Sequence, residues 1–188
     1  VQDRIHGLAL VHQNLYSAER LDHVALDQLA RDVALYLGQS FNAPASELDF
    51  EFQLEEVTVD AATATPAALF LTEAVSNVFK HAVMPRGRVK VVIGLRRENG
   101  EFALSVCNPV LPAMAQASSA NVAAPDEPSG LGTRLMTSFA QQLAGSFERR
   151  EEGGTFIVTL RAPLGEERAR FSIRQRAEGP SELEAEDA

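Results

Sequence analysis

The sequence predicts an α+β domain, in which a mixed sheet carries its helices on one face. Three observations support this class. Residues 26–41 repeat apolar side chains at helical spacing, residues 48–54 alternate between apolar and polar, and residues 69–82 return to helical spacing. Two hairpin patterns follow, with a further helical pattern between them. Helices and strands are therefore expected to form separate layers around one core.

Four segments are expected to be helical. Residues 1–16 carry apolar side chains near the helical period, and residues 17–22 break that pattern. A second helix over residues 26–41 is expected to end before Pro44. A third helix is expected to begin near Pro66, because proline suits the first turn of a helix.

The strands are predicted from alternation and from turn residues. Residues 48–54 alternate as a half-buried strand should. Residues 89–95 and 102–106 predict two further strands, and residues 98–101 (Glu-Asn-Gly-Glu) form a hairpin turn signal between them.

The second half of the chain combines a loop, a helix and a hairpin. Residues 109–129 are rich in Ala, Ser and Pro and show no period, which is typical of a long mobile loop, and loops of this length in compact domains are often lids. Residues 130–144 predict the fourth helix, and Gly145 is expected to cap it. Residues 146–149 and 154–160 predict a final hairpin.

Composition narrows the class of protein. The chain has 188 residues and a net charge of −9, which argues against nucleic acid as a main partner. Cys107 is the only cysteine, so an internal disulfide is excluded and a reducing compartment is expected. We find no apolar run long enough to span a bilayer and no signal peptide, so we expect a cytoplasmic location without membrane contact. Because the sequence begins with Val1 and not with Met, we expect it to be a fragment of a longer protein.

A row of polar residues on the third predicted helix is the most informative feature. Glu73, Asn77, Lys80 and His81 are three or four residues apart, so they share one face of the helix. An ordinary solvated surface would explain such a row. A multiply charged ligand lying against the helix, such as a nucleotide with its metal ion, would explain it as well.

A second candidate site precedes the fourth predicted helix. Gly130-Leu131-Gly132-Thr133 would let the backbone approach a phosphate, and a helix N-terminus offers free N–H groups and partial positive charge. A Gly-x-Gly on its own is a weak signal, since a plain loop-to-helix joint reads the same way.

Four segments together resemble one family. Residues 71–82 (LTEAVSNVFKHA) resemble the N-box of the GHKL ATPase superfamily, in the form seen in sensor histidine kinases of the HWE and related types. Residues 129–145 resemble the second glycine box of those kinases, and residues 153–160 (GGTFIVTL) their last strand. Residues 4–16 (RIHGLALVHQNLY) are similar to their second dimerisation helix. The resemblance covers about residues 1–163.

The resemblance implies a fold and a domain organisation. It implies a GHKL (Bergerat-type) α/β sandwich over residues 21–164, preceded in residues 1–20 by the second helix of a dimerisation and phosphotransfer arm. Residues 165–188 would be a charged, disordered tail. The family's phosphorylated histidine lies on a preceding helix that is absent here, so His6 and His12 are expected to be packing residues.

The resemblance also implies an activity. The chain would be the ATP-binding part of a two-component histidine kinase, a transferase that passes the γ-phosphoryl of ATP to a histidine and then, by phosphorelay, to a response regulator receiver domain. The full-length protein would form a homodimer.

The resemblance further assigns roles to single residues. Asn77 would bind Mg²⁺, and Glu73 would polarise the attacking group or a metal-bound water. Lys80 and His81 would face the phosphates. The second glycine box would form the hinge of the lid that closes on the triphosphate, and its members are Gly130, Leu131, Gly132 and Thr133.

One segment departs from the family. The first glycine box, roughly V-x-D-x-G-x-G-L-P, is degenerate here, and residues 106–112 read VCNPVLP. Asn108 replaces the aspartate that binds the adenine amino group, which is expected to cost about 1–2 kcal/mol, or about ten-fold in affinity. Pro109 also removes a backbone donor.

This departure keeps other functions open. One alternative is an ATP-independent histidine phosphotransferase or a pseudokinase scaffold with a kinase-like domain. A third reading is another GHKL member, such as an anti-sigma kinase or a chaperone-type ATPase, although the helix over residues 4–16 would have no arm role there.

Overall fold

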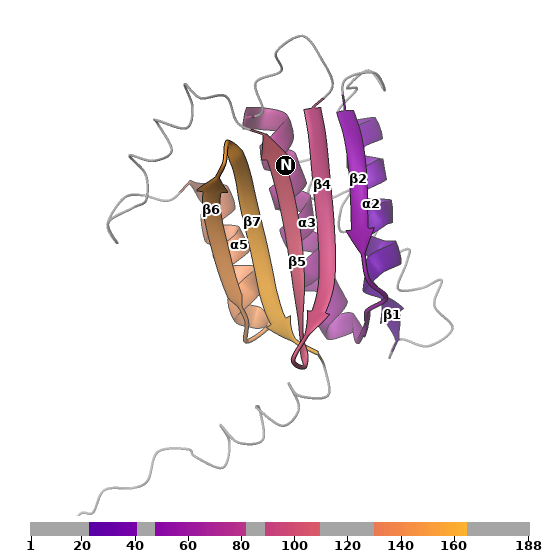
Figure 1. The fold of residues 1–188 in the computed structure, drawn as a ribbon. Helices are drawn as coiled ribbons and strands as arrows, with labels where there is room; N and C mark the ends of the chain where they lie inside the picture. Colours follow the sequence, from indigo (N-terminus) through magenta and orange to yellow (C-terminus); the bar gives the residue numbers. More distant parts are fainter. Residues whose placement is uncertain (1–22, 41–47, 82–88, 110–129, 165–188) are drawn as a thin grey trace, which may run out of the picture.

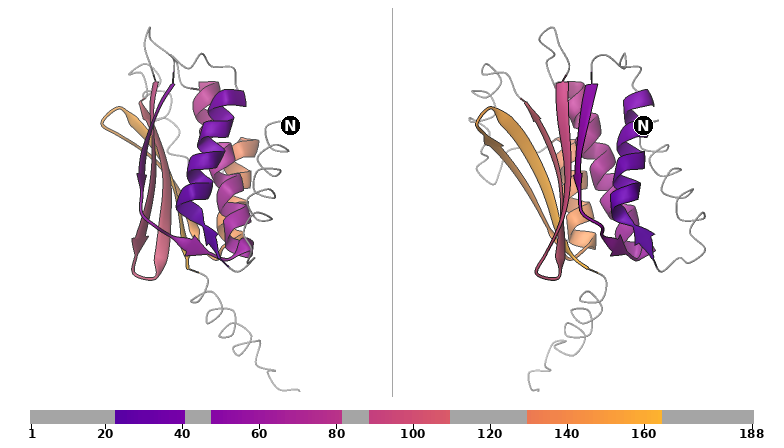
Figure 2. Two further views of the ribbon diagram at one scale, coloured as in Figure 1. Left: turned by 90° about the vertical axis from the view of Figure 1, so that its right-hand side faces the viewer. Right: turned by 45° about the vertical axis from the view of Figure 1, so that its right-hand side comes forward.

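A mixed sheet with its helices on one face forms the domain, as the sequence predicts. The computed structural model describes residues 23–40, 48–81, 89–109 and 130–164. Its sheet has the strand order β2 (Leu48–Leu54), β4 (Val89–Glu98), β5 (Glu101–Pro109), β7 (Thr155–Pro163) and β6 (Ser146–Glu152). The strands β2 and β4 pair in parallel, and the other neighbours pair antiparallel. Figure 2 shows the helices that the structure describes on the same side of this sheet.

Four of the five strands of the described sheet extend further than the alternation predicts, whereas β2 has the predicted bounds. Two short strands, β1 (Val24–Ala25) and β3 (Thr58–Val59), form a separate antiparallel pair that the sequence analysis missed. Two-residue strands carry no alternation that a pattern search could detect.

The helices pack their apolar stripes against the sheet. These helices are α2 (Leu26–Ser40), α3 (Ala61–His81) and α5 (Leu131–Gln142). The core contains Phe70 and Leu71 from α3 together with Ile93 and Leu104 from the sheet, each at most 1% exposed. Within the part of the chain that the structure describes, no helix is long and apolar enough to cross a membrane.

The start of α3 corrects a prediction. The helix begins at Ala61, so Pro66 lies in its second turn and not in its first. Asp60 explains the earlier start, because its side-chain Oδ1 accepts a hydrogen bond from the N–H of Thr63 at 2.7 Å. This cap satisfies one of the free N–H groups at the helix start.

The end of α5 corrects another prediction, namely that Gly145 caps this helix. The N–H of Gly145 donates to the carbonyl oxygen of Ala140, and the N–H of Ala144 donates to that of Gln141. This is a Schellman motif, in which Ala144 (φ 52°) and not Gly145 takes the left-handed conformation. Gly145 has another role, because a methyl group on it would lie 2.1 Å from the carbonyl oxygen of Arg161.

Several predictions fall outside the described residues. The dimerisation arm of residues 1–20, with His6 and His12, is one of them. Most of the predicted lid and the tail of residues 165–188 are others. Pro109, the first residue of that predicted lid, is the last residue of β5.

Candidate functional site

The predicted site residues meet at one end of the domain. The last turns of α3, the first turn of α5 and the last residues of β5 lie at the upper end in Figure 1. Strand β5 runs antiparallel to β7, so the first residues of β7 reach the same end. Two helices and two strands of the sheet therefore contribute to this region, which we call the upper end.

Asn77 and Glu73 lie next to the start of α5. A methyl group on Gly132 would lie 3.4 Å from Nδ2 and 3.5 Å from Oδ1 of Asn77. The same methyl group would lie 3.7 Å from Oε2 of Glu73. The structure thus brings Glu73 and Asn77 of the polar row close to Gly132 of the second glycine box.

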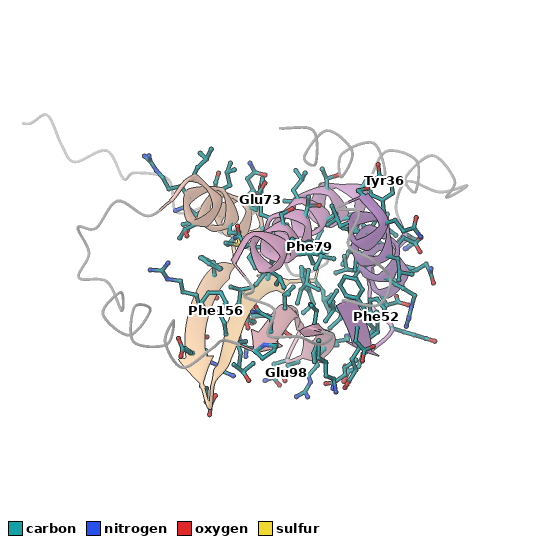
Figure 3. The ribbon with its side chains drawn as sticks, turned by 90° about the horizontal axis from the view of Figure 1, so that it is seen from above. Tyr36, Phe52, Glu73, Phe79, Glu98 and Phe156 are labelled. Atoms are coloured by element: carbon teal, nitrogen blue, oxygen red, sulfur yellow. The ribbon has the colours of Figure 1, made fainter. Side chains whose placement is uncertain are left out.

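Burial distinguishes the two α3 residues. Glu73 is 3% exposed, whereas Asn77 is half-buried. Figure 3 shows Glu73 on α3 near α5 in the view from above. Acidic side chains are almost never this buried unless they are paired, so the row is not an ordinary solvated surface at Glu73.

The first turn of α5 carries no side-chain cap. Gly130 occupies the N-cap position without a side-chain hydrogen bond, and the first turn holds no acidic residue. Leu131 is 63% exposed, and Thr133 is half-exposed. The first N–H groups of a helix have no partner within the helix. These groups and the positive end of the helix dipole lie beside Asn77, an arrangement that can bind an anion.

Asn108 lies in the sheet itself. It is 6% exposed, and the alternation of β5 places it on the helix-facing side with Val106 and Leu104. Its Nδ2 donates a hydrogen bond to the carbonyl oxygen of Pro109 at 3.2 Å. Strand pairing continues through both residues, because Asn108 pairs with Phe156 and Pro109 with Thr155.

Neighbouring residues help to delimit the site. Cys107 lies on the opposite face of β5 from Asn108, and burial raises the pKa of its thiol. Lys80 and His81 belong to the last turn of α3, and their contacts with phosphates stay a prediction.

Two further residues of this region, Phe156 and Glu151, were not predicted from the sequence. They share a row with Asn108 across β7 and β6. No local sequence signal marks this row, because it depends on the register of three strands.

These features together define a GHKL-type ATPase fold. They are the mixed sheet, the helical layer on one of its faces, and the polar row beside a helix start that is flanked by glycines. The family comparison agrees with this class. The chain belongs to the histidine kinase-like ATPase domain family, whose model matches residues 44–185.

Solved structures support the same fold. The histidine kinase domain of the blue-light activated histidine kinase EL346 from Erythrobacter litoralis is 18% identical, with a TM-score of 0.71 over 91% of this chain and 77% of that one. The longer EL346 structure is 19% identical, with a TM-score of 0.69 over 88% of this chain and 49% of that chain.

A third structure matches over almost its whole length. The catalytic domain of the histidine kinase ThkA is 18% identical, with a TM-score of 0.59 over 79% of this chain and 98% of that chain. A comparison with curated protein sequences found no match.

Proposed function

We propose that this chain is the ATP-binding catalytic part of a two-component sensor histidine kinase of the HWE-like type. It would transfer the γ-phosphoryl of ATP to a histidine for relay to an aspartate of a response regulator receiver domain. The observation that carries the proposal is the convergence of Asn77 and Glu73 on Gly132 at the uncapped start of α5.

The residues present fit a magnesium ion. Mg²⁺ prefers oxygen ligands and is usually held by one or two protein groups together with substrate phosphates. The side-chain oxygen of Asn77 lies within reach of the first turn of α5, where phosphates would bind. Among the described residues, no group of three or more His, Cys, Asp or Glu could form a cage for a metal ion. Asn77 would hold Mg²⁺ together with the phosphates, and the ion when bound neutralises phosphate charge.

The remaining roles follow from position. The N–H groups of the first turn of α5 would bind phosphate oxygens, and Glu73 would orient and polarise the attacking group. Lys80 and His81 would add positive charge at the same end of α3. Asn108, on the neighbouring strand, would accept a hydrogen bond from the amino group of adenine through its Oδ1, because its Nδ2 is already engaged by Pro109.

The upper end also favours a second candidate function. Asn108 replaces an aspartate, and β5 stays paired with β7 through Pro109. A degenerate glycine box of this kind would suit an ATP-independent histidine phosphotransferase or a pseudokinase scaffold. We rank it second because such a protein would have no need for a nearly buried Glu73 beside Asn77.

The proposal extends to the organisation of the whole protein. Residues 1–20 would be half of a dimerisation arm, residues 21–164 the catalytic domain and residues 165–188 a tail. The chain covers only 49% of the longer EL346 structure. The family resemblance supports the proposal that the phosphoacceptor histidine lies on a helix that precedes residues 1–20. The full-length protein would be a cytoplasmic homodimer.

A calorimetric titration tests the proposal. The chain is titrated with ATP in excess Mg²⁺ and again with EDTA in place of the metal. The kinase proposal predicts binding at micromolar to low-millimolar concentrations that weakens strongly without Mg²⁺. Absence of binding at several millimolar ATP would reject it in favour of the relay or scaffold function.

A further inference from the structure

Glu151 has no role in the functions described so far, yet its environment is unusual. Its Oε2 is shielded from solvent and finds no hydrogen-bond partner among the residues that the structure describes. A buried acceptor without a partner costs about 1–3 kcal/mol, and more when it is charged. Such an atom in a native protein calls for a physical explanation.

The register of the sheet places Glu151 at the upper end. Glu151 on β6 pairs with Phe156 on β7, which in turn pairs with Asn108 on β5. Directly opposed residues share one face of a sheet. The three side chains therefore form one helix-facing row, which continues inward to the buried side chains of Val158 and Leu160.

Exposure shows that this part of the helix-facing surface is incompletely covered. Four residues before Glu151 on β6, further from the tip of the hairpin, Phe147 packs edge-on against Phe70 of α3, with ring centroids 5.7 Å apart. Towards the tip, Arg149 is exposed and Phe156 is half-buried, although both face the helices. Figure 2 shows the tip of the β6–β7 hairpin bending away from the helical layer. A ligand between the two layers would therefore meet Glu151.

The chemistry of a carboxylate narrows what it would bind. An ionised carboxylate accepts hydrogen bonds and repels phosphates. In a nucleotide, the groups that can donate are the amino group of the base and the hydroxyls of the sugar. Asn108 already accounts for the amino group, and Glu151 lies two strands away, about 10 Å along the row, which is comparable with the length of a nucleoside.

We infer that Glu151 accepts hydrogen bonds from the ribose hydroxyls of the nucleotide and makes the site selective for ribonucleotides. The inference rests on the proposed function, since it requires a nucleotide at the upper end. An acidic side chain that binds a ribose hydroxyl is a recurring solution in other nucleotide-binding folds. The unpaired Oε2 is then explained as an acceptor that the ligand satisfies.

The test compares ATP, 2′-deoxyATP and 3′-deoxyATP by calorimetry in excess Mg²⁺. The unmodified chain should bind at least one deoxynucleotide about ten-fold more weakly than ATP, because a hydrogen bond to a charged group is lost. Glu151→Gln should bind the three nucleotides with nearly equal affinity. Glu151→Asp withdraws the carboxylate by one methylene group and should also lose most of the discrimination.

A matched control lies on the same strand. Glu148 pairs with Thr159 and is exposed on the opposite face of the sheet. Glu148→Gln removes the same charge from β6 and should keep the discrimination of the unmodified chain.

Thermal unfolding without nucleotide gives an independent readout. Because Oε2 has no partner to lose, Glu151→Gln should melt at the same temperature as the unmodified chain or higher. A clear fall in melting temperature would show a structural role and overturn the inference.

The binding results separate the two levels of the argument. Equal affinity of the unmodified chain for ATP and both deoxynucleotides would overturn the inference alone, as would discrimination that survives in Glu151→Gln. Failure of all three nucleotides to bind would reject the proposed function and this inference with it.

Discussion

The helical layer and the sheet touch through backbone and apolar side chains where α5 ends and β6 begins, a region that we call the lower end. Leu143, Leu160 and Ala162 are fully buried there, and Gly145 lies against the carbonyl oxygen of Arg161. At the upper end the same strands present Asn108, Phe156 and Glu151 on the same face.

The difference between the two ends has a physical cause. Close packing at the lower end leaves room for no further atom, so it holds the layers together. Polar side chains at inward positions of the upper end prevent equally dry packing, because each needs a hydrogen-bond partner. One end thus supplies stability, and the other keeps polar groups available for a ligand. The following predictions test this division.

The largest expected effect is a loss of stability at the lower end. Gly145→Ala would place a methyl group 2.1 Å from the carbonyl oxygen of Arg161 and 3.0 Å from Cα of Ala162. Backbone atoms of β7 would have to shift, so we expect a loss of about 3 kcal/mol in the free energy of unfolding. Urea denaturation measures it. Gly130→Ala is the control, because nothing lies within 4 Å of its added methyl group, and it should cost less than about 1 kcal/mol.

At the upper end, Asn77→Ala should affect binding and spare stability. Loss of the oxygen that we assign to Mg²⁺ should weaken Mg²⁺-dependent ATP binding roughly a hundred-fold, equivalent to about 2.7 kcal/mol. Calorimetry measures the affinity, and denaturation should show a change below about 1 kcal/mol, because Asn77 is only half-buried. Gln141→Ala, an exposed amide on α5, should leave binding unchanged. Unaltered ATP affinity in Asn77→Ala would remove this residue from the site.

Asn108→Asp should strengthen binding. A carboxylate would make a charge-assisted hydrogen bond to the amino group of adenine, which is about twice as strong as a neutral one. We therefore expect about ten-fold higher affinity for ATP, measured by the same titration, whereas Asn108→Ala should bind more weakly than the unmodified chain. Weaker binding by the aspartate variant would mean that adenine does not lie against Asn108.

The smallest expected effect concerns Ala144 in the Schellman motif at the end of α5. Ala144 has φ 52°, a left-handed conformation that costs a residue with a Cβ about 1 kcal/mol. Ala144→Gly should therefore raise the free energy of unfolding by roughly 0.5–1 kcal/mol without changing ATP affinity. A thermal melting curve measures the change in stability, and one titration with ATP measures the affinity. Destabilisation would mean that the methyl group of Ala144 contributes packing energy that outweighs the cost of its left-handed conformation.

The sequence predicted the parts of the fold that depend on hydrophobic periodicity. The strand β2 was bounded correctly, and α2 to within one residue, because alternation in one and helical spacing in the other are uninterrupted. Local hydrogen bonds decided the errors. Asp60 starts α3 before Pro66, and the Schellman bonds put Ala144 where glycine was expected.

The residues of the candidate site can likewise be divided into those that the sequence predicts and those that it does not. Asn77, Glu73 and Gly132 could be found because each belongs to a local motif, although only the structure shows that they touch. Glu151 could not be found, because its significance comes from a register across three strands. Charged residues dominate β6, so the strand looked like a surface hairpin with no inward side.

Hydrogen–deuterium exchange with and without Mg²⁺ and ATP tests the division between the two ends most directly. The account predicts slower exchange at residues 131–133 of α5 and at the last residues of β5 when nucleotide is present, with no change in β7 around Leu160 and Ala162. Protection confined to the lower end, or no protection anywhere at saturating ATP, would contradict it.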